Sequence, residues 1–245
     1  MRISYSATWN DAVAMLRGNA SLLLAVAGVF FLLPALLAGY FIPQPEAAGD
    51  AAIAVMIAHA REHWPWLLLA NIVNMLGAVA IYLLLLGRRG ISVGGAIAAA
   101  LPILPFYFLL SVLTGLLVGF GLALLILPGV YLLGRVAVAG AVMVAEARRN
   151  PIDAIRQAFA RSKGNGWAVA GLVLIVGLAG ALLSFAITAV LGTVFLLVGG
   201  REGIGGLLVL ILNSALSAAF STVLVTLFAA IYRALGAGET PTSGS

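Results

Sequence analysis

The sequence of 245 residues contains no cysteine, so it can form neither a disulfide framework nor a cysteine-ligated metal site. Charged residues are also scarce, because they make up only 9% of the chain. A water-soluble protein of this length needs more charge than this to cover its surface. The scarcity of charge therefore excludes an ordinary soluble domain.

Arrangements of residues that could support catalysis are lacking as well. No segment combines a nucleophile with a general base, and no pair of carboxylates lies within an apolar run. The glycine-rich stretch at 199–206 has neither the lysine nor the strand–helix context of a nucleotide-binding loop. We therefore expect a protein that is not an enzyme and that needs no cofactor.

Hydrophobic residues, by contrast, make up 63% of the chain and form long uncharged runs. A helix needs about 20 apolar residues to cross the hydrocarbon core of a bilayer. Six such helices fit the sequence, at about 20–42, 66–87, 103–126, 129–147, 166–198 and 206–234. These runs predict an all-α membrane bundle that occupies residues 1–236 as one domain, followed by a flexible tail at 237–245.

Two details of these spans can be predicted from residue type and length. Leu127-Pro128-Gly129 separates the third span from the fourth, and this sequence favours a tight turn. The fifth span has 33 uncharged residues, which is long for one crossing and short for two. Either a tilted helix or a helix with a re-entrant piece would fit this length.

Arginine and lysine are distributed unevenly between the two sides of these six spans. Ten of them fall on one side: Arg2, Arg17, Arg88, Arg89, Arg148, Arg149, Arg156, Arg161, Lys163 and Arg233. Only Arg61 and Arg201 fall on the other side. Because basic residues concentrate on the cytoplasmic side of membrane proteins, both termini are predicted to be cytoplasmic.

A short amphipathic segment precedes each pair of spans. The clearest begins with Asn150 as a helix cap and Pro151 at the first helical position. Its expected apolar face consists of Ile152, Ile155, Ala158 and Phe159, and its expected water-facing basic residues are Arg156, Arg161 and Lys163. A helix of this kind lies in the membrane interface rather than across it.

Two weaker copies of this segment complete a three-fold plan. In the N-terminal copy, Ser6 is the expected cap and Trp9, Ala12, Val13 and Leu16 share one face. In the other, Val93, Ile97 and Leu101 share a face. The sequence thus predicts three helical hairpins, each preceded by a cytoplasmic interfacial helix.

Several of these residues also form a family pattern. The pattern comprises Leu127-Pro128-Gly129-Val130-Tyr131, Arg135, Glu146, Asp153-Ala154-Ile155, Ser162-Lys163-Gly164 and Trp167. It resembles the membrane domain of some bacterial glycerophosphoryl diester phosphodiesterases and of small stand-alone membrane proteins. The resemblance covers about residues 90–185 and departs from the pattern at Gln157-Ala158-Phe159. It implies a bacterial inner-membrane protein without the catalytic barrel, so phosphodiesterase activity does not carry over.

His59, Glu62 and His63 give the H-x-x-E-H spacing of some zinc peptidases. Such a site also needs a third ligand, and on the same side of the membrane only Glu46, Asp50 and Glu202 could supply one. No supporting motif lies near any of these acids. We interpret Ala51–His63 as an amphipathic loop helix without a metal site. A membrane metallopeptidase is therefore only a distant third candidate for the function.

Polar residues inside the spans suggest a second kind of site. Arg135 lies about six residues into the fourth span, and an intramembrane cation is a functional candidate by default. It could instead extend to the outer interface or bond carbonyls freed around Pro128. Asn213 and Ser217 lie four residues apart on the last span. They could line a polar transport path, or they could form hydrogen bonds between packed helices. Gly115, Gly119 and Gly121 are expected to form a close-packing surface.

Five basic residues, Arg148, Arg149, Arg156, Arg161 and Lys163, could hold anionic lipid headgroups or could simply set orientation. We therefore expect a lipid-associated, membrane-organising or partner-binding membrane protein, with a transporter of small solutes or lipids as the alternative. The expected partners are membrane lipids, including anionic ones, and then other membrane proteins or a second copy of the chain. No feature indicates nucleic-acid binding.

The topology can be tested directly with fusions. Reporters placed after Arg89, Lys163 and Ser245 should all report the cytoplasm, because ten basic residues fall on that side of the predicted spans and two on the other. A periplasmic signal at Ser245 alone would mean that residues 166–198 cross the membrane twice.

Overall fold

The computed structural model describes residues 3–42, 45, 49, 52–87 and 90–236, and every regular element within these ranges is a helix. Six helical stretches are long and apolar enough to cross a membrane, which confirms the predicted all-α polytopic class. They are Ala20–Phe41, Ala52–Leu86, Leu104–Leu124, Ile126–Ala145, Gly166–Gly199 and Ile204–Gly236. The expected tail at 237–245 lies outside the described residues.

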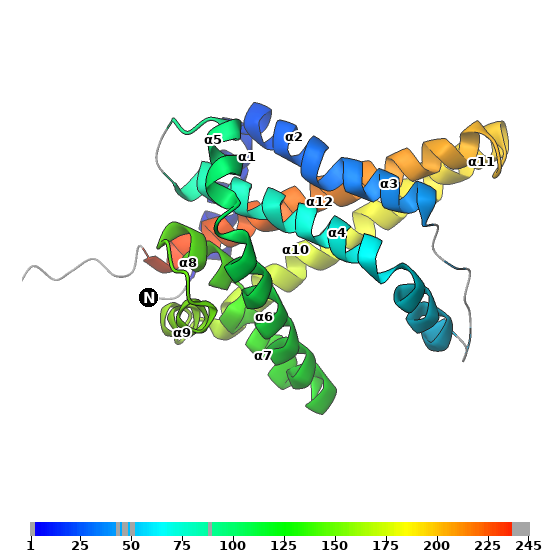
Figure 1. The fold of residues 1–245 in the computed structure, drawn as a ribbon. Coiled ribbons are helices and arrows are strands. Elements are labelled where there is room, and N and C mark those ends of the chain that lie inside the picture. The colour runs from blue at the N-terminus through cyan, green and yellow to red at the C-terminus, as the bar shows by residue number, and fades with distance from the viewer. Residues whose placement is uncertain (1–2, 43–44, 46–48, 50–51, 88–89, 237–245) are drawn as a thin grey trace, which may run out of the picture.

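The chain is organised as three successive units (Figure 1). The first contains α1 (Tyr5–Gly18), α2 (Ala20–Ala27), the π-helix η1 (Gly28–Leu32), α3 (Leu33–Phe41) and α4 (Ala52–Leu86). The second contains α5 (Val93–Ala100), α6 (Leu104–Leu124), α7 (Ile126–Val136) and α8 (Ala139–Ala145). The third contains α9 (Pro151–Arg161), α10 (Gly166–Ile187), the π-helix η3 (Thr188–Gly192), α11 (Thr193–Gly199) and α12 (Ile204–Gly236).

The three short leading helices begin at polar caps. The Asn150 side chain accepts a hydrogen bond from the Ile152 amide at 3.0 Å, as the sequence predicts. Ser92 caps α5 in the same way, with a bond of 3.1 Å from Gly95. The expected cap at Ser6 is wrong, because Ser4 has the extended backbone of a cap and accepts from the Ala7 amide.

The turn between the third and fourth spans also differs from the prediction. Leu125 alone is extended, with φ −160° and ψ 143°, and α7 already includes Pro128 and Gly129. Pro128 lies in the first turn of α7, where a missing amide hydrogen breaks no helical bond. Gly129 is needed for close packing, since a Cβ there would lie 2.5 Å from the backbone nitrogen of Leu122.

Two long stretches are more continuous than the sequence suggests. The expected separate loop helix before Trp64 is instead the first part of α4, which contains Pro65 and bends near its start in Figure 1. The alanine-rich stretch ahead of Pro65 favours a helix strongly enough to extend past the proline. Residues 166–199 form one helical stretch of 34 residues, interrupted only by η3. At 1.5 Å per residue this is about 50 Å, which fits a tilted span.

The first span contains a π-helical segment with an identifiable cause. Pro34 has no amide hydrogen and its ring would clash with the carbonyl four residues earlier in a regular helix. The wider turn of η1 ends two residues before Pro34, so the chain absorbs this conflict without breaking the span.

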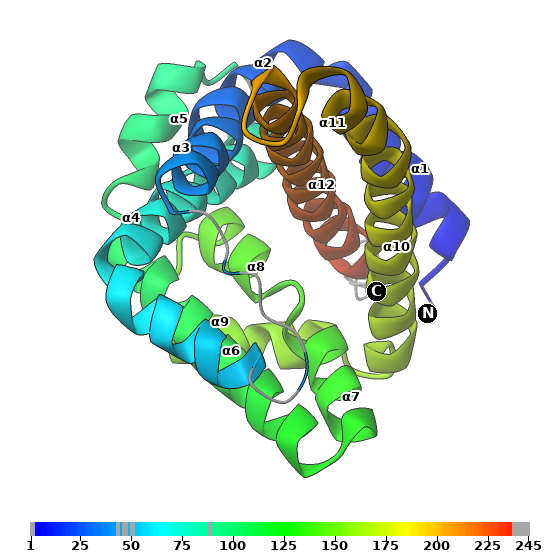
Figure 2. The ribbon, with the colours of Figure 1, turned by 90° about the vertical axis from the view of Figure 1, so that its right-hand side faces the viewer.

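The packed core lies at one end of the molecule. The helices α1, α5 and α9 gather there with the C-terminal part of α12, and we call this the α9 end (Figure 1). Figure 2 shows α8 inside the ring of longer helices at this end. Val138, Ala139, Val142 and Met143 are almost completely buried against α4, α9 and α12. This short buried helix therefore determines how the three units meet.

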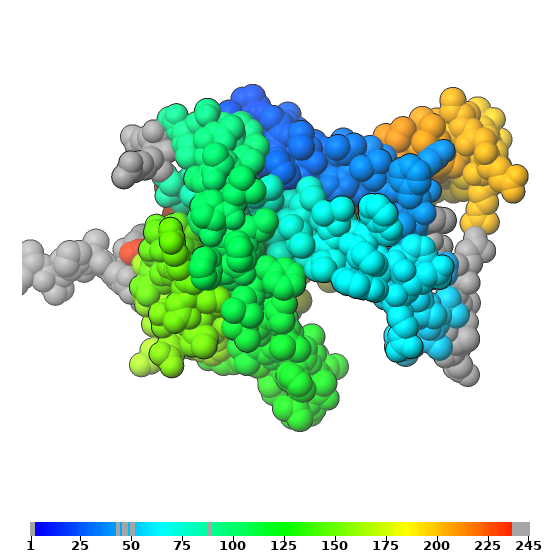
Figure 3. Space-filling view, in the orientation of Figure 1, coloured from blue at the N-terminus to red at the C-terminus, as the bar shows by residue number. Residues whose placement is uncertain are grey.

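Away from the α9 end, the helices separate. The α6–α7 hairpin and the first part of α4 diverge, and Figure 3 shows a notch between them. Leu124, Leu125 and Ile126 at the hairpin turn are highly exposed. These large apolar side chains are suited to lipid rather than to water.

The contact of α7 with α10 gives a test of this packing. A Cβ at Gly134 would collide with the Gly166 carbonyl and lie 2.8 Å from the Ala170 Cβ, so Gly134→Ala should destabilise the fold by about 1–3 kcal/mol. Gly115→Ala is the matched control, because a Cβ there meets only open space. Thermal unfolding in detergent should separate the two variants. Equal stability would show that α7 and α10 do not approach as described.

Candidate functional site

The α9 end carries most of the charge in the described chain. Residues 135–163 contain six basic residues and two acidic ones, a net charge of +4. The structure divides these basic side chains into a buried group and an exposed group. The two groups have different chemical roles.

The turn that follows α8 positions the acidic centre of the buried group. The Arg148 amide donates to the Met143 carbonyl at 2.9 Å and the Ala147 amide donates to Val144 at 3.3 Å, which is the Schellman pattern of a helix end. Ala147 takes the left-handed conformation, with φ 50°, that usually requires glycine. This turn places Glu146 and Arg148 side by side.

Glu146 is the shared partner of two arginines. It lies 2.9 Å from Arg161 and 2.7 Å from Arg148, and the Tyr232 hydroxyl donates to it at 3.4 Å. The Arg161 guanidinium also lies 4.8 Å from the Tyr232 ring centroid. The Arg161 and Glu146 side chains are only 14% and 17% exposed. The expectation that Arg161 faces water is therefore wrong, because Glu146 and an aromatic ring replace water as its partners.

Arg135 joins α7 to α9. Its Nη2 donates to the Phe159 carbonyl at 2.6 Å, and the single hydroxyl hydrogen of Ser162 is shared between the Ala158 carbonyl at 2.7 Å and the Arg135 carbonyl at 3.1 Å. Phe159 lies in the last turn of α9, where a cation stabilises the negative end of the helix dipole. Arg135 thus bonds a carbonyl of α9 instead of one near Pro128 and does not extend to the outer interface.

The exposed group consists of Arg149, Arg156 and Lys163, which we call the basic face. Arg156 is 79% exposed, and its distance of 3.9 Å from Asp153 makes only a weak pair. The apolar side of α9 is also shifted from the prediction. Pro151, Ala154 and Ala158 are buried, whereas Ile152 is 52% exposed because it lies on the opposite side of the helix.

The predicted polar residues of the last span are not gathered around Arg135. Asn213 accepts a hydrogen bond of 2.8 Å from Thr188 in η3, and Ser217 is exposed. The buried polar residues of α12 are instead Ser214, Thr222 and Thr226. Spacings of eight and four residues place these three side chains on one face of α12. The Thr222 and Thr226 hydroxyls each donate to the carbonyl four residues earlier on the same helix. This face can therefore pack closely against a neighbouring helix.

The two histidines lie at the other end of the molecule from α9. Their ring centroids are 4.6 Å apart, and the His63 Nδ1 hydrogen-bonds the His59 carbonyl at 3.1 Å. No group of three histidines or acids that could hold a metal occurs among the described residues. Glu46 and Asp50, two of the three acids considered as further ligands, lie outside those residues.

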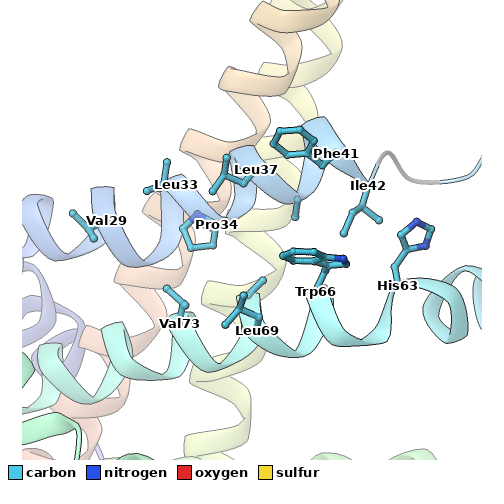
Figure 4. A pocket seen from close by; sticks show the side chains of 12 residues that line it. Val29, Leu33, Pro34, Leu37, Phe41, Ile42, His63, Trp66, Leu69 and Val73 are labelled. Atoms are coloured by element: carbon cyan, nitrogen blue, oxygen red, sulfur yellow. The ribbon is translucent and has the colours of Figure 1, made fainter.

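Three apolar cavities open along the surfaces of the spans. One of about 800 Å³ lies between the first span and α4, and Figure 4 shows His63 and Trp66 at one end of it with Val29 and Val73 toward the other. A second, of about 650 Å³, lies between α1, α10 and α12 and is lined by Tyr5 and Trp9. A third, of about 520 Å³, lies between α7 and the start of α10.

Sequence reasoning missed the roles of Tyr131 and Tyr232. Tyr131 accepts a hydrogen bond of 3.0 Å from Arg135 and packs on Trp167 at 5.4 Å. Its position four residues before Arg135 on one helix is a signal that could have indicated this contact. Tyr232 is separated from Glu146 by 86 residues, so no local pattern could have found it.

Comparison with protein-family models, curated proteins and solved structures finds no match to this chain. The resemblance to the phosphodiesterase membrane domain therefore stays a prediction. The site must be interpreted from its own geometry: a buried ionic joint that fixes α9, and an exposed basic face whose Lys163 directly precedes a residue of the cavity between α7 and α10.

The ionic joint can be tested at its acidic member. Glu146→Gln removes the charge that Arg161 and Arg148 share, and should lower the free energy of unfolding by about 1–3 kcal/mol. Arg156→Gln, which alters an exposed pair on α9, should change the free energy of unfolding by about 0.5 kcal/mol or less. Denaturation in detergent micelles measures both. Similar losses in the two variants would contradict a special role for Glu146.

Proposed function

We propose that the chain is a non-enzymatic integral membrane protein that associates with anionic lipids through its α9 end, and so organises lipid or a partner protein. The single observation that carries this proposal is the basic face. Its three cations lie on or next to the fixed α9, and among the described residues the weak pair of Arg156 is their one ion pair with a carboxylate. Each cation near an anionic bilayer contributes about 1 kcal/mol.

The apolar cavities support a lipid rather than a polar solute as the natural ligand. Eleven of the twelve residues around the cavity of about 800 Å³ are apolar, and His63 is the exception. Acyl chains fit such surfaces, whereas a transport path for a polar solute needs hydrogen-bonding groups along it. The alternative of a lipid transporter shares this feature, but Arg135 and Asn213 bond to different helices and provide no shared polar path.

We place the protein in the bacterial inner membrane with both termini in the cytoplasm. Asp11 of α1 and Arg233 of α12 form an ion pair of 3.4 Å, which supports a common side for the two ends. The excess of basic residues at this end supports the cytoplasmic side. A second copy of the chain is a further candidate partner, since Gly115 and Gly119 face open space.

Lipid enrichment in nanodiscs tests the proposed function. Wild type should co-purify with more phosphatidylglycerol than phosphatidylcholine from an equal mixture. The triple variant Arg149→Gln, Arg156→Gln and Lys163→Gln should lose more than tenfold in this preference, because three charges contribute about 3 kcal/mol at low salt. The matched control is Arg61→Gln with Arg201→Gln, at the other end of the molecule. Equal enrichment in all three proteins would contradict the proposal.

A further inference from the structure

The cavity between α7 and α10 is lined in part by Gly164, which directly follows Lys163 of the basic face. Its volume is about 520 Å³, and its lining includes Pro128, Tyr131, Gly164 and Trp167. The Trp167 side chain is 54% exposed and packs on Tyr131 with ring centroids 5.4 Å apart. Aromatic rings with one polar edge are typical of the level at which lipid headgroups lie.

Tyr131 supplies a hydrogen-bond donor to this cavity. Its oxygen accepts from the Arg135 Nη1 at 3.0 Å, so the hydroxyl hydrogen remains to be donated. No acceptor for that hydrogen occurs among the described residues. A hydroxyl that accepts from a guanidinium is polarised and becomes a better donor to an anion.

The charge behind Tyr131 is positive and comes from Arg135. No carboxylate in the described part of the chain lies within ion-pair distance of Arg135, and its Nε has no hydrogen-bond partner there. Its contacts are the neutral Phe159 carbonyl and the rings of Tyr131 and Phe159. An anion in the cavity would therefore experience an attraction that no protein group cancels.

A second cation lies next in the chain to the lining of the cavity. Lys163 is exposed and directly precedes Gly164, which lines the cavity. Of the two acidic residues nearby in sequence, Glu146 already binds two arginines and Asp153 faces Arg156. Neither carboxylate neutralises Lys163.

The opposite side of the cavity is apolar. Leu127 lines it and is highly exposed, and it continues into the apolar surface of the α6–α7 turn at Leu124 and Ile126. The site therefore combines a donor and two cations with an apolar surface. An anionic glycerophospholipid has the matching distribution of charge and acyl chain.

We infer that this cavity binds one anionic phospholipid, whose phosphate accepts the Tyr131 hydroxyl hydrogen and pairs with Lys163 while an acyl chain lies on Leu127. This inference rests on the proposed function and names its specific site. The basic face attracts anionic lipid in general, whereas the cavity selects a single molecule by its headgroup.

Native mass spectrometry of the full chain with added phosphatidylglycerol tests the site. One molecule should stay bound at a concentration where phosphatidylcholine does not. Tyr131→Phe removes only the hydroxyl and should weaken binding of this lipid roughly ten- to a hundredfold, the effect of losing one hydrogen bond to a charged group. Tyr40→Phe, at an exposed tyrosine of α3, should leave occupancy unchanged. An unchanged occupancy in Tyr131→Phe would overturn the site.

A second pair of variants separates the site from general electrostatic attraction. Lys163→Gln should lower the occupancy several-fold, and more than Arg156→Gln does. Equal losses in these two variants, with none in Tyr131→Phe, would overturn the site while leaving the proposed function intact. Wild type that binds phosphatidylcholine as tightly as phosphatidylglycerol would overturn both.

A fluorescence measurement on the folded protein does not depend on the stability of Tyr131→Phe. In a variant that keeps Trp167 and replaces the other three tryptophans by phenylalanine, brominated phosphatidylglycerol should quench emission with a saturable, one-site dependence. Brominated phosphatidylcholine should quench less. Equal quenching by both lipids would contradict headgroup selection. Displacement of the lipid by free glycerol phosphate at equal concentration would contradict the role of the acyl chain.

Discussion

The ion pair between Arg161 and Glu146 is the interaction on which the α9 end depends. Glu146 follows the buried helix α8, Arg161 ends α9, and Tyr232 of α12 closes the same cluster. The pair is largely removed from water, so separating its members would leave a charge without a partner in an apolar surrounding. This penalty keeps the second and third units of the chain in one arrangement.

The contacts of Arg135 and Ser162 reinforce this arrangement from the other side of α9. Arg135 hydrogen-bonds a carbonyl of α9, and Ser162 hydrogen-bonds a carbonyl of α7. The C-terminal ends of α7 and α9 are therefore held next to each other. With α8 buried between α4, α9 and α12, close packing is concentrated at one end of the spans. Toward the other end the helices diverge and present large apolar side chains. A bilayer tolerates such a surface, because lipid chains solvate it.

This division favours a role in which a rigid, basic end meets the headgroup region while open apolar surfaces meet acyl chains. Among the described residues, the fixed polar groups of the α9 end bond to one another, as Glu146 does to two arginines and Arg135 does to the Phe159 carbonyl. The polar contacts thus serve to position α9. The residues left over, the basic face and the Tyr131 hydroxyl, are those available to a lipid.

The sequence by itself determined the helical class, the six spans and the three leading helices, because apolar run length and helix caps are local properties. It also singled out Arg135 and the basic residues of α9 as candidates. Only the tertiary structure decided which of these are buried: Arg161 became an internal ion, and Arg135 became a bond between helices. Such outcomes depend on contacts between residues far apart in the chain, as between Glu146 and Tyr232. A periodic pattern in the sequence cannot predict contacts of this kind. The end of α6 and the continuity of α4 across Pro65 were decided in the same way, since helix–helix packing outweighs the local preference of proline and glycine for turns.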